Sequence, residues 1–222
     1  MPHGLEAPII YLITSGKTTA ATTPASKEFS RILKLTEAAV AANINLVQLR
    51  EKKLAARVLY TLTELSAAIT RGSPTHLLVN DRADVACAGG ASGVHLTSQS
   101  LKPEVVRSAF GNRFLIGKST HSFAEARQAL DSGADFVVFG PVFETASKQR
   151  YGPPVGPDTL RRVANELAPF PVLAIGGINQ DNLATTFAAG AQGIAAIGLL
   201  NRPEQLTDIA EAIRVAYAQR KK

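Results

Sequence analysis

Three five-residue stretches decide the fold: GASGV at residues 90–94, GADFV at 133–137 and GAQGI at 190–194. Each opens with a Gly-Ala pair where a segment of helical spacing ends, and each passes through one polar residue into an apolar run. Glycine is favoured just after a helix because it adopts a left-handed backbone conformation without steric cost. The same joint used three times indicates a repeated unit of one strand and one helix.

Outward from these joints, short apolar runs alternate with longer segments of helical periodicity, such as residues 29–42, 54–70 and 123–132. The runs lack a clean polar/apolar alternation, as expected for parallel strands that are buried on both faces. We expect an α/β fold, a single-domain (β/α)8 TIM barrel over residues 1–222 with its core at about 8–218, and hold an open doubly wound sheet as the alternative. The predicted strands are residues 8–14, 45–50, 76–81, 93–97, 114–120, 136–142, 171–176 and 193–199.

Two helix starts have a recognisable capping pattern. Ser122 stands three residues before Glu125, so hydroxyl and carboxylate are predicted to bind the free amides of the first turn. Asn201 precedes Pro203 and Glu204 in a similar arrangement, ahead of the last predicted helix.

Composition excludes several classes of protein. The chain has 222 residues, 45% of them hydrophobic and 19% charged, which rules out a disordered or collagen-like chain. No apolar run is long enough to cross a membrane, and the first residues show no secretory signal. The single cysteine, Cys87, has no partner for an internal disulfide and is expected to be a small core residue. We therefore expect a cytoplasmic protein.

The net charge of +6 does not by itself indicate nucleic-acid binding. The basic residues are scattered, and their one tight cluster is the tail Arg220, Lys221 and Lys222. A modest positive excess also suits a small anionic substrate, so we expect neither a nucleic acid nor a membrane as partner.

In a TIM barrel, function gathers at the C-terminal ends of the strands. Gly176, Gly177 and Gly198 follow the last two predicted strands and suggest a phosphate site, with two tight turns as the alternative. The polar residues that end the earlier strands are Gln48, Arg50, Glu51, Lys52, Asn80, Asp81, Arg82, Ser119, Thr120, His121, Glu144, Thr145, Ser147 and Lys148.

Two of these positions suggest chemistry of their own. Asn80 with Asp81 could hold a divalent cation, most simply magnesium with a diphosphate, or Asp81 could cap the next helix or pair with Arg82. His121 ends a strand and could move protons, or it could be a hydrogen-bonded turn residue. His95 lies within a strand and is expected to be structural.

These residues belong to an ordered series of motifs: QLREK at 48–52, VNDR at 79–82, GVHL at 93–96, IGKSTHS at 116–122, FGPVF at 139–143, GPP at 152–154 and AIGG at 174–177. With them the chain resembles the thiamine phosphate synthase/TenI superfamily from about residue 11 to 200. The resemblance implies a TIM barrel that binds phosphate esters, namely a thiazole phosphate, thiamine phosphate or a pyrimidine diphosphate, and leaves a homo-oligomer open.

In the synthase branch, the resemblance implies that the enzyme joins a hydroxymethylpyrimidine diphosphate to a thiazole phosphate and releases pyrophosphate. Ser119 would face the reacting pyrimidine, Lys148 the diphosphate, and Asp81 would bind Mg²⁺. The implied substrate ligands are Gln48, Arg50, Lys52 and Asn80 for the pyrimidine diphosphate, and Thr145, Ser147, Gly177 and Gly198 for the thiazole phosphate.

The chain departs from the synthase pattern in one loop. After His95-Leu96 the synthases have Gly-Gln-Glu-Asp, whose aspartate is a second magnesium ligand, whereas this chain has TSQS at 97–100. Gly198 also stands where the synthases show serine. TenI-type members lack the loop carboxylate too, need no metal, and tautomerise a carboxythiazole phosphate with a histidine that matches His121.

We therefore predict a TenI-like thiazole tautomerase, with His121 as general acid/base, Gly176, Gly177 and Gly198 as phosphate clamp, Lys148 as charge support, and no cofactor. The alternative enzyme is an Mg²⁺-dependent thiamine phosphate synthase with a weakened metal site. A third hypothesis is a non-catalytic protein that binds or senses a thiamine phosphate.

Overall fold

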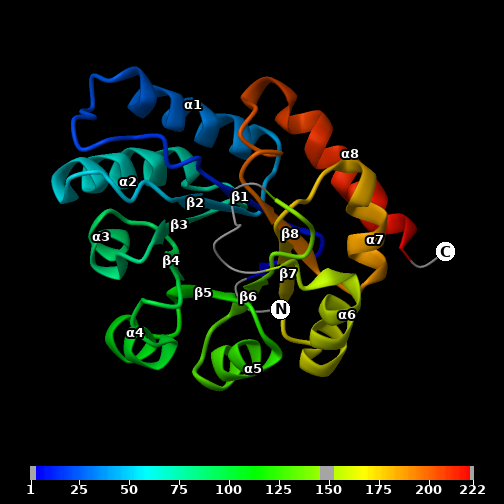
Figure 1. Cartoon of the computed structure of the whole chain (residues 1–222). Coiled ribbons are helices and arrows are strands. Elements are labelled where there is room, and N and C mark those ends of the chain that lie inside the picture. The colour runs from blue at the N-terminus through cyan, green and yellow to red at the C-terminus, as the bar shows by residue number, and fades with distance from the viewer. Residues whose placement is uncertain (1–3, 146–152, 221–222) are drawn as a thin grey trace.

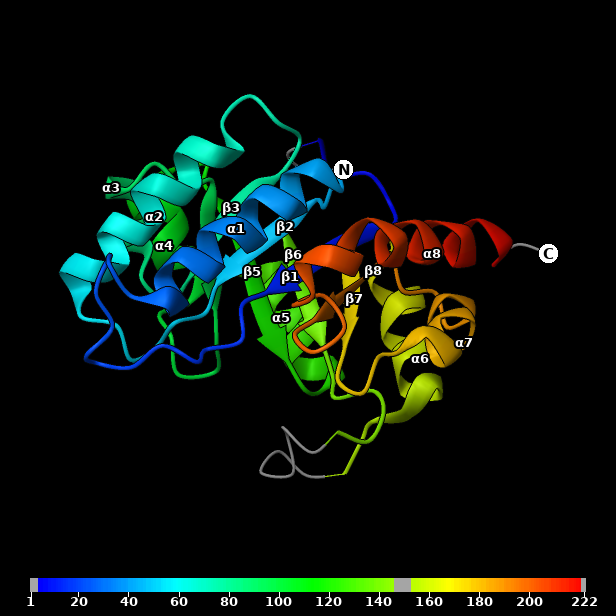
Figure 2. The same cartoon turned by 90° about the horizontal axis from the view of Figure 1, so that it is seen from above.

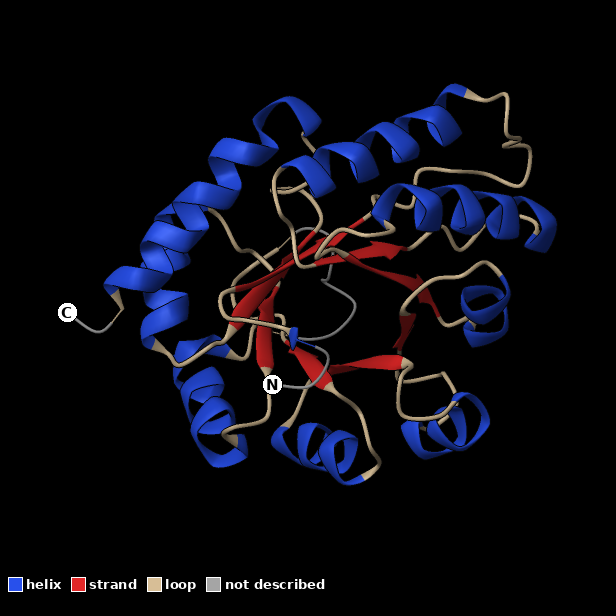
Figure 3. Ribbon diagram, turned by 180° about the vertical axis from the view of Figure 1, so that it is seen from behind, coloured by secondary structure: helices blue, strands red, loops and turns tan. Residues whose placement is uncertain are grey.

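A computed structural model describes residues 4–145 and 153–220 of the chain. Its strands form one closed barrel in which every strand is parallel to both neighbours and follows chain order, and the helices surround it (Figures 1 and 3). The first strand pairs with the last, with Ile9 opposite Gly193. This closure confirms the predicted (β/α)8 barrel and excludes the open sheet.

Strands and helices alternate along the whole chain. The strands are β1 (Ile9–Ile13), β2 (Leu46–Leu49), β3 (His76–Asn80), β4 (Gly93–Leu96), β5 (Leu115–Thr120), β6 (Phe136–Phe139), β7 (Val172–Ile175) and β8 (Gly193–Ala196). The helices are α1 (Lys27–Ala41), α2 (Ala56–Thr70), α3 (Ala83–Ala88), α4 (Pro103–Phe110), α5 (Phe123–Asp131), α6 (Gly156–Leu167), α7 (Leu183–Ala188) and α8 (Leu206–Gln219), with short 3-10 turns at Gln180–Asn182 and Pro203–Gln205.

The core has two layers because side chains of a strand alternate between its faces. On β1, Ile9, Tyr11 and Ile13 pack inside the barrel, while Ile10 and Leu12 belong to the larger cluster between barrel and helices. The outer layer is closed where the first and last helices, α1 and α8, lie side by side (Figure 2).

The three Gly-Ala joints have the backbone that the sequence predicts. Gly90, Gly133 and Gly190 adopt φ angles of 75°, 85° and 84°, and each follows a helix and precedes a strand. These left-handed residues turn the chain from a helix into the next strand, so the repeated joint is confirmed.

Several predicted strands end earlier in the structure, at the end of the barrel where we expect the site. The predicted strand 136–142 stops at Phe139, because Gly140 has a φ of 157° and Pro141 has no N–H to donate to a neighbouring strand. The predicted strand 193–199 likewise stops at Ala196. The remaining residues of both segments form loops at the barrel mouth.

The capping predictions hold in part. The Ser122 hydroxyl accepts from the backbone N–H of Glu125 at 3.2 Å, as expected, but the Glu125 carboxylate accepts from the N–H of His121 rather than from that of Ser122. Asn201 caps no helix: its side-chain amide donates to the carbonyl oxygens of Ile13 and Ile197 at 2.7 Å each. Asn201 thus ties the end of β1 to the loop after β8.

Cys87 is exposed near the end of α3, so its expected place in the core is wrong. The buried face of this short helix is formed by Ala83, Val85 and Ala86, which leaves Cys87 on the opposite, outer side. Within the described residues, no helix combines the length and hydropathy that crossing a bilayer requires.

Candidate active site at the barrel mouth

Gln48, the last but one residue of β2, and Asn80, the last residue of β3, are hydrogen-bonded to each other. The Gln48 Nε2 donates to Asn80 Oδ1 at 3.1 Å, and the two residues are 1% and 9% exposed. The Gln48 Oε1 is buried and has no hydrogen-bond partner among the described residues. Since an unpaired buried acceptor costs free energy, this oxygen is suited to accept a hydrogen bond from a ligand.

Two cations follow Gln48 at the end of β2. Arg50 is half-buried and Lys52 is exposed, and neither side chain forms an ion pair within the described part of the chain. The backbone N–H of Arg50 donates to Thr14 Oγ1 at 2.8 Å, which fixes the end of β2 against that of β1. Cations without a carboxylate partner are suited to bind an anionic substrate.

Asp81 lies at the end of β3 with an unusual backbone conformation. Its φ is 64°, a left-handed value that is uncommon outside glycine, and its N–H donates to the carbonyl oxygen of His95 at 2.9 Å. The alternatives for Asp81 do not hold, because α3 has no side-chain cap and Arg82 pairs with Asp84 at 2.6 Å. The hydrogen bond from Arg82 lowers the pKa of Asp84. The exposed Asp81 carboxylate therefore faces solvent at the mouth.

Ser119 on β5 is held from below by a buried histidine. The His95 Nε2 lies 2.8 Å from Ser119 Oγ, and the His95 ring is 3% exposed. Its ring centroid lies 5.6 Å from that of Tyr11 and 6.3 Å from that of Phe136, inside the barrel. Burial raises the pKa of Tyr11 well above its ordinary value, so this aromatic floor is uncharged. His95, which the sequence analysis treated as structural, fixes the Ser119 hydroxyl at the mouth.

His121 follows β5 and is anchored at two atoms. Its Nδ1 is hydrogen-bonded to the carbonyl oxygen of Gly140 in the loop after β6, and its backbone N–H donates to the Glu125 carboxylate at 2.7 Å. Because a carbonyl oxygen only accepts, Nδ1 must hold the proton of the neutral ring, and Nε2 is then the basic nitrogen. The geometry is compatible with both alternatives, an acid/base and a turn residue.

The predicted phosphate clamp lines one cavity of about 160 Å³ beside the ends of β7 and β8. Thr145, Gly176, Gly177 and Gly198 all contribute to its wall. Gly176 and Gly177 have φ angles of 96° and 65°, and a Cβ on Gly177 would come within 2.4 Å of the Glu144 carbonyl oxygen. A Cβ on Gly198 would meet no atom of the described residues within 4 Å. Gly176 and Gly177 are therefore required by the backbone, whereas Gly198 leaves open space in the cavity.

Ser147 and Lys148, which the sequence predicts at this site, lie outside the described residues.

Glu51 is a part of the site region that sequence reasoning did not resolve. Its carboxylate is 3% exposed and accepts hydrogen bonds from the N–H of Gly16, the N–H of Thr18 and the Thr18 hydroxyl at 3.0, 3.3 and 2.6 Å. It therefore holds the loop after β1 next to Arg50, whose backbone and side chain border Gly16. Glu51 is placed to support the mouth rather than to contact a substrate.

A closed parallel barrel with cations after β2 and a glycine-lined cavity after β7 and β8 defines a class of protein. Phosphate sites of TIM-barrel enzymes occur at the loops after strands seven and eight, and active sites occur at this end of the barrel. The fold and the site are thus those of a TIM-barrel enzyme with room for a phosphorylated substrate.

Comparison with known proteins identifies the family. The model of the family described as thiamine monophosphate synthase matches residues 11–200, and the chain belongs to this family. A relative in Geobacter sulfurreducens is 43% identical over 169 residues, which are 76% of this chain and 79% of that one. The thiamine-phosphate synthase of Chloroflexus aurantiacus is 38% identical over 178 residues, 80% of this chain and 82% of its own.

A solved structure agrees with these relatives. The thiamine phosphate pyrophosphorylase from Pyrococcus furiosus has a TM-score of 0.77 and 29% identity, over 96% of both chains. The resemblance drawn from the motifs is confirmed at the level of the family. The comparisons favour the synthase, which the sequence analysis held as the alternative, and give no specific support to the tautomerase.

Proposed function

We propose that this protein is a thiamine-phosphate synthase that joins a hydroxymethylpyrimidine diphosphate to a thiazole phosphate. The observation that carries the proposal is the family match over residues 11–200, with relatives of 38% identity and more that are named thiamine-phosphate synthase. In the reaction, the thiazole nitrogen forms a bond to the pyrimidine methylene carbon. The bond from that carbon to the diphosphate oxygen breaks, and pyrophosphate leaves with the electron pair.

The two anionic substrates suit two parts of the mouth. Arg50 and Lys52 would bind the diphosphate together with Asn80, since they lie beside the end of β3 and have no carboxylate partner among the described residues. The cavity lined by Gly177 and Gly198 would hold the phosphate of the thiazole. Backbone N–H groups near glycine can approach a phosphate closely, which is the expected role of such a cavity.

Two side chains in the middle of the mouth would orient the pyrimidine. The unpaired Gln48 Oε1 is available to accept from an N–H of the aminopyrimidine. The Ser119 hydroxyl, fixed by His95 at 2.8 Å, would face the carbon that is attacked. Positioning of this kind can contribute several kcal/mol to a reaction between two bound substrates.

Magnesium fits this site as an ion that enters with the diphosphate. Asp81 offers one exposed carboxylate, and the described residues include no cluster of three or more His, Cys, Asp or Glu that could hold a metal alone. Mg²⁺ is commonly bound by one or two carboxylates together with substrate phosphates and water. When bound, it would neutralise charge on the leaving pyrophosphate, and Asp81 is the residue that would hold it.

The tautomerase remains a second candidate because of one observation at His121. The hydrogen bond from Nδ1 to Gly140 leaves Nε2 as the basic nitrogen, which is what a proton-transfer residue needs. The synthase reaction as written moves no proton, so His121 has no required chemical role in it. The two functions thus make opposite demands on this residue.

The decisive experiment supplies purified protein with both synthase substrates and Mg²⁺, and measures thiamine phosphate and pyrophosphate in equal amounts. The synthase proposal expects His121→Asn to keep most of the activity and Asp81→Asn to lose about a hundredfold, with a raised Mg²⁺ requirement. Asp84→Asn is the matched control, because this nearby carboxylate pairs with Arg82. No thiamine phosphate from active protein, together with turnover of the carboxythiazole phosphate that His121→Asn abolishes, would establish the tautomerase instead. Tight binding of thiamine phosphate without either reaction would establish the binding protein.

A further inference from the structure

Lys118 on β5 lies on the opposite face of the strand from Ser119. Ser119 meets His95 inside the barrel, whereas the side chain of Lys118 leaves the other face of the strand, and both residues border the same cavity. The Lys118 ammonium donates to the carbonyl oxygen of Thr97 at 2.6 Å, its one hydrogen bond within the described residues. Burial lowers the pKa of this lysine. Lys118 is thus a half-buried cation at the edge of the catalytic mouth.

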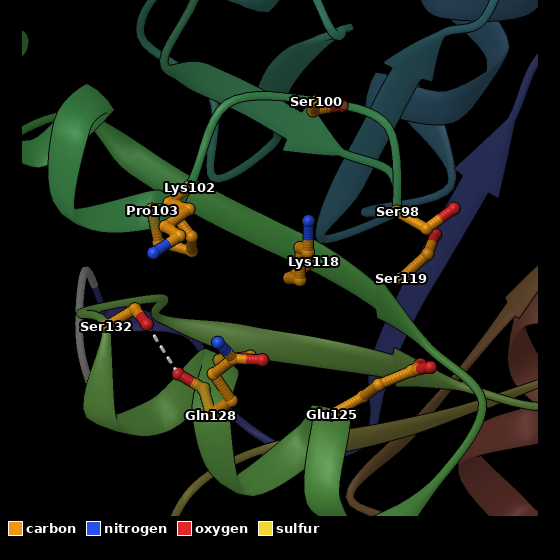
Figure 4. A pocket seen from close by; sticks show the side chains of 10 residues that line it. Ser98, Ser100, Lys102, Pro103, Lys118, Ser119, Glu125, Gln128 and Ser132 are labelled. Atoms are coloured by element: carbon orange, nitrogen blue, oxygen red, sulfur yellow. Dashed lines mark hydrogen bonds between the residues drawn. The ribbon is translucent and has the colours of Figure 1, made fainter.

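The ammonium borders a cavity of about 270 Å³ between α4 and α5, which we call the Lys118 cavity (Figure 4). A second lysine, Lys102, contributes from the residue before α4, and Gln128 faces both lysines from α5. The hydroxyl-bearing residues of the wall are Ser98, Ser100, Ser119 and Ser132, and Ser119 is shared with the mouth. Two ammonium groups, an amide and several hydroxyls thus surround one small space.

The charges and donors at this cavity suit an anion. The Lys118 ammonium has three N–H groups and uses one of them on Thr97, so the other two are available to a ligand. The single carboxylate of the wall belongs to Glu125 and already accepts from the N–H of His121 at 2.7 Å. Lys102 has only a long, exposed contact of 3.6 Å with Glu104. Such a contact contributes little and is easily exchanged.

The volume of the cavity and the directions of its donors indicate which class of anion fits. Donors that come from a strand, a loop and a helix approach from different directions, which suits a tetrahedral oxyanion better than a planar carboxylate. The apolar part of the wall, Pro103 and Ala129, could cover an organic group attached to it. A cavity of about 270 Å³ exceeds what a bare phosphate fills.

We propose that the Lys118 cavity is a second anion site, which binds the phosphoryl group of a small phosphate ester between Lys118 and Lys102. It is separate from the cavity at Gly177 and Gly198, which lies beside β7 and β8 and shares no residue with it. It adjoins the mouth at Ser119, which lines the cavity as well, but neither of its two lysines has a part in the chemistry assigned above.

The test observes the two lysines directly in the wild-type protein. Protein labelled with ¹³C-lysine is titrated with inorganic phosphate at constant ionic strength, and the side-chain methylene signals of Lys118 and Lys102 are followed by NMR. Both signals are expected to shift with one common midpoint. The signal of Lys34, an exposed residue of α1 on another part of the surface, is the internal control and is expected to stay.

Variants separate the site from a general effect of charge. Lys118→Met is expected to weaken the midpoint at Lys102 at least tenfold, Lys118→Arg to keep it within about threefold, and Lys34→Met to leave it unchanged. If the Lys118 and Lys102 signals do not move, or move only as much as that of Lys34, the proposal is overturned. An unchanged midpoint at Lys102 in Lys118→Met would overturn it as well. Synthase activity is not among the readouts, so failure here leaves the proposed function untouched.

Discussion

The carboxylate of Glu51 offers a sharp test of how the mouth is held together. It is 3% exposed and accepts its three hydrogen bonds from the loop after β1, with no cation beside it in the described hydrogen bonds and ion pairs. Replacement by alanine leaves the N–H groups of Gly16 and Thr18 and the Thr18 hydroxyl without their acceptor. The loop must then form hydrogen bonds to water or change its conformation.

The magnitude follows from these contacts. A hydrogen bond to a charged group contributes about 1.5–3 kcal/mol, but the bond at 3.3 Å is long and a surface loop can partly rehydrate. We therefore expect Glu51→Ala to lower the free energy of unfolding by about 3 kcal/mol, and for a chain of this size the Tm by roughly 6–12 °C. Because Gly16 borders Arg50, the KM for the diphosphate substrate should rise as well.

The assay is thermal and urea unfolding of a double-mutant cycle between Glu51→Ala and Thr18→Val. The strongest contact, at 2.6 Å, joins these two side chains, so a coupling free energy of about 1–2 kcal/mol is expected. Glu28→Ala, which removes an exposed carboxylate of α1, is the control and should change stability by less than about 0.5 kcal/mol. A loss in Glu51→Ala no larger than in this control, or a coupling near zero, would refute the argument.

Three further predictions concern the residues around the site. His95→Leu should lower kcat far more than it raises KM, because it removes the partner of the Ser119 hydroxyl. His95→Gln should restore part of kcat. Equal kcat in the wild type and both variants would contradict this prediction. Gly198→Ser should leave the Tm unchanged, because the added side chain has open space, and should lower the KM for thiazole phosphate about fivefold, because one hydrogen bond contributes about 1 kcal/mol. Gly177→Ser should instead destabilise the protein through its clash at 2.4 Å. Thermal melts and steady-state kinetics distinguish the two variants. The pKa of Lys118, followed by NMR, should lie below that of an ordinary lysine, because burial disfavours its charge. Saturating phosphate should raise this pKa, so phosphate binding should weaken as the pH rises through the pKa. A pKa that phosphate does not change would contradict the second anion site.

Local sequence patterns were sufficient to predict the barrel, because each of its parts has a local physical cause. The apolar runs identify strands buried on both faces, and Gly90, Gly133 and Gly190 mark the turns from helix to strand. The gathering of Gly177 and Gly198 with Thr145 in one cavity also follows from the fold, since parallel strands end at the same rim.

Contacts between distant side chains could not be predicted in the same way. Glu51 stands between two cations in the sequence, yet its carboxylate binds a loop more than thirty residues earlier. His95 gives no periodic signal of its own. Its partner could have been found from the strand register, because His95 lies opposite Gly117 and Ser119 is the next inward position of β5.

The alternation of side chains between the two faces of a strand also explains how β5 contributes to both the barrel interior and the Lys118 cavity. Ser119 and Lys118 are adjacent in the chain, but their side chains lie on opposite faces of β5, one over the aromatic floor of the barrel and the other under α4 and α5. Glu125 joins the two sides, since it borders the Lys118 cavity and holds the backbone of His121 at the mouth. An anion that binds Lys118 would add negative charge beside Glu125 and next to the Ser119 hydroxyl. Glu125→Gln should therefore reduce the part of the ligand's effect on turnover that passes through His121, while binding at Lys118 persists.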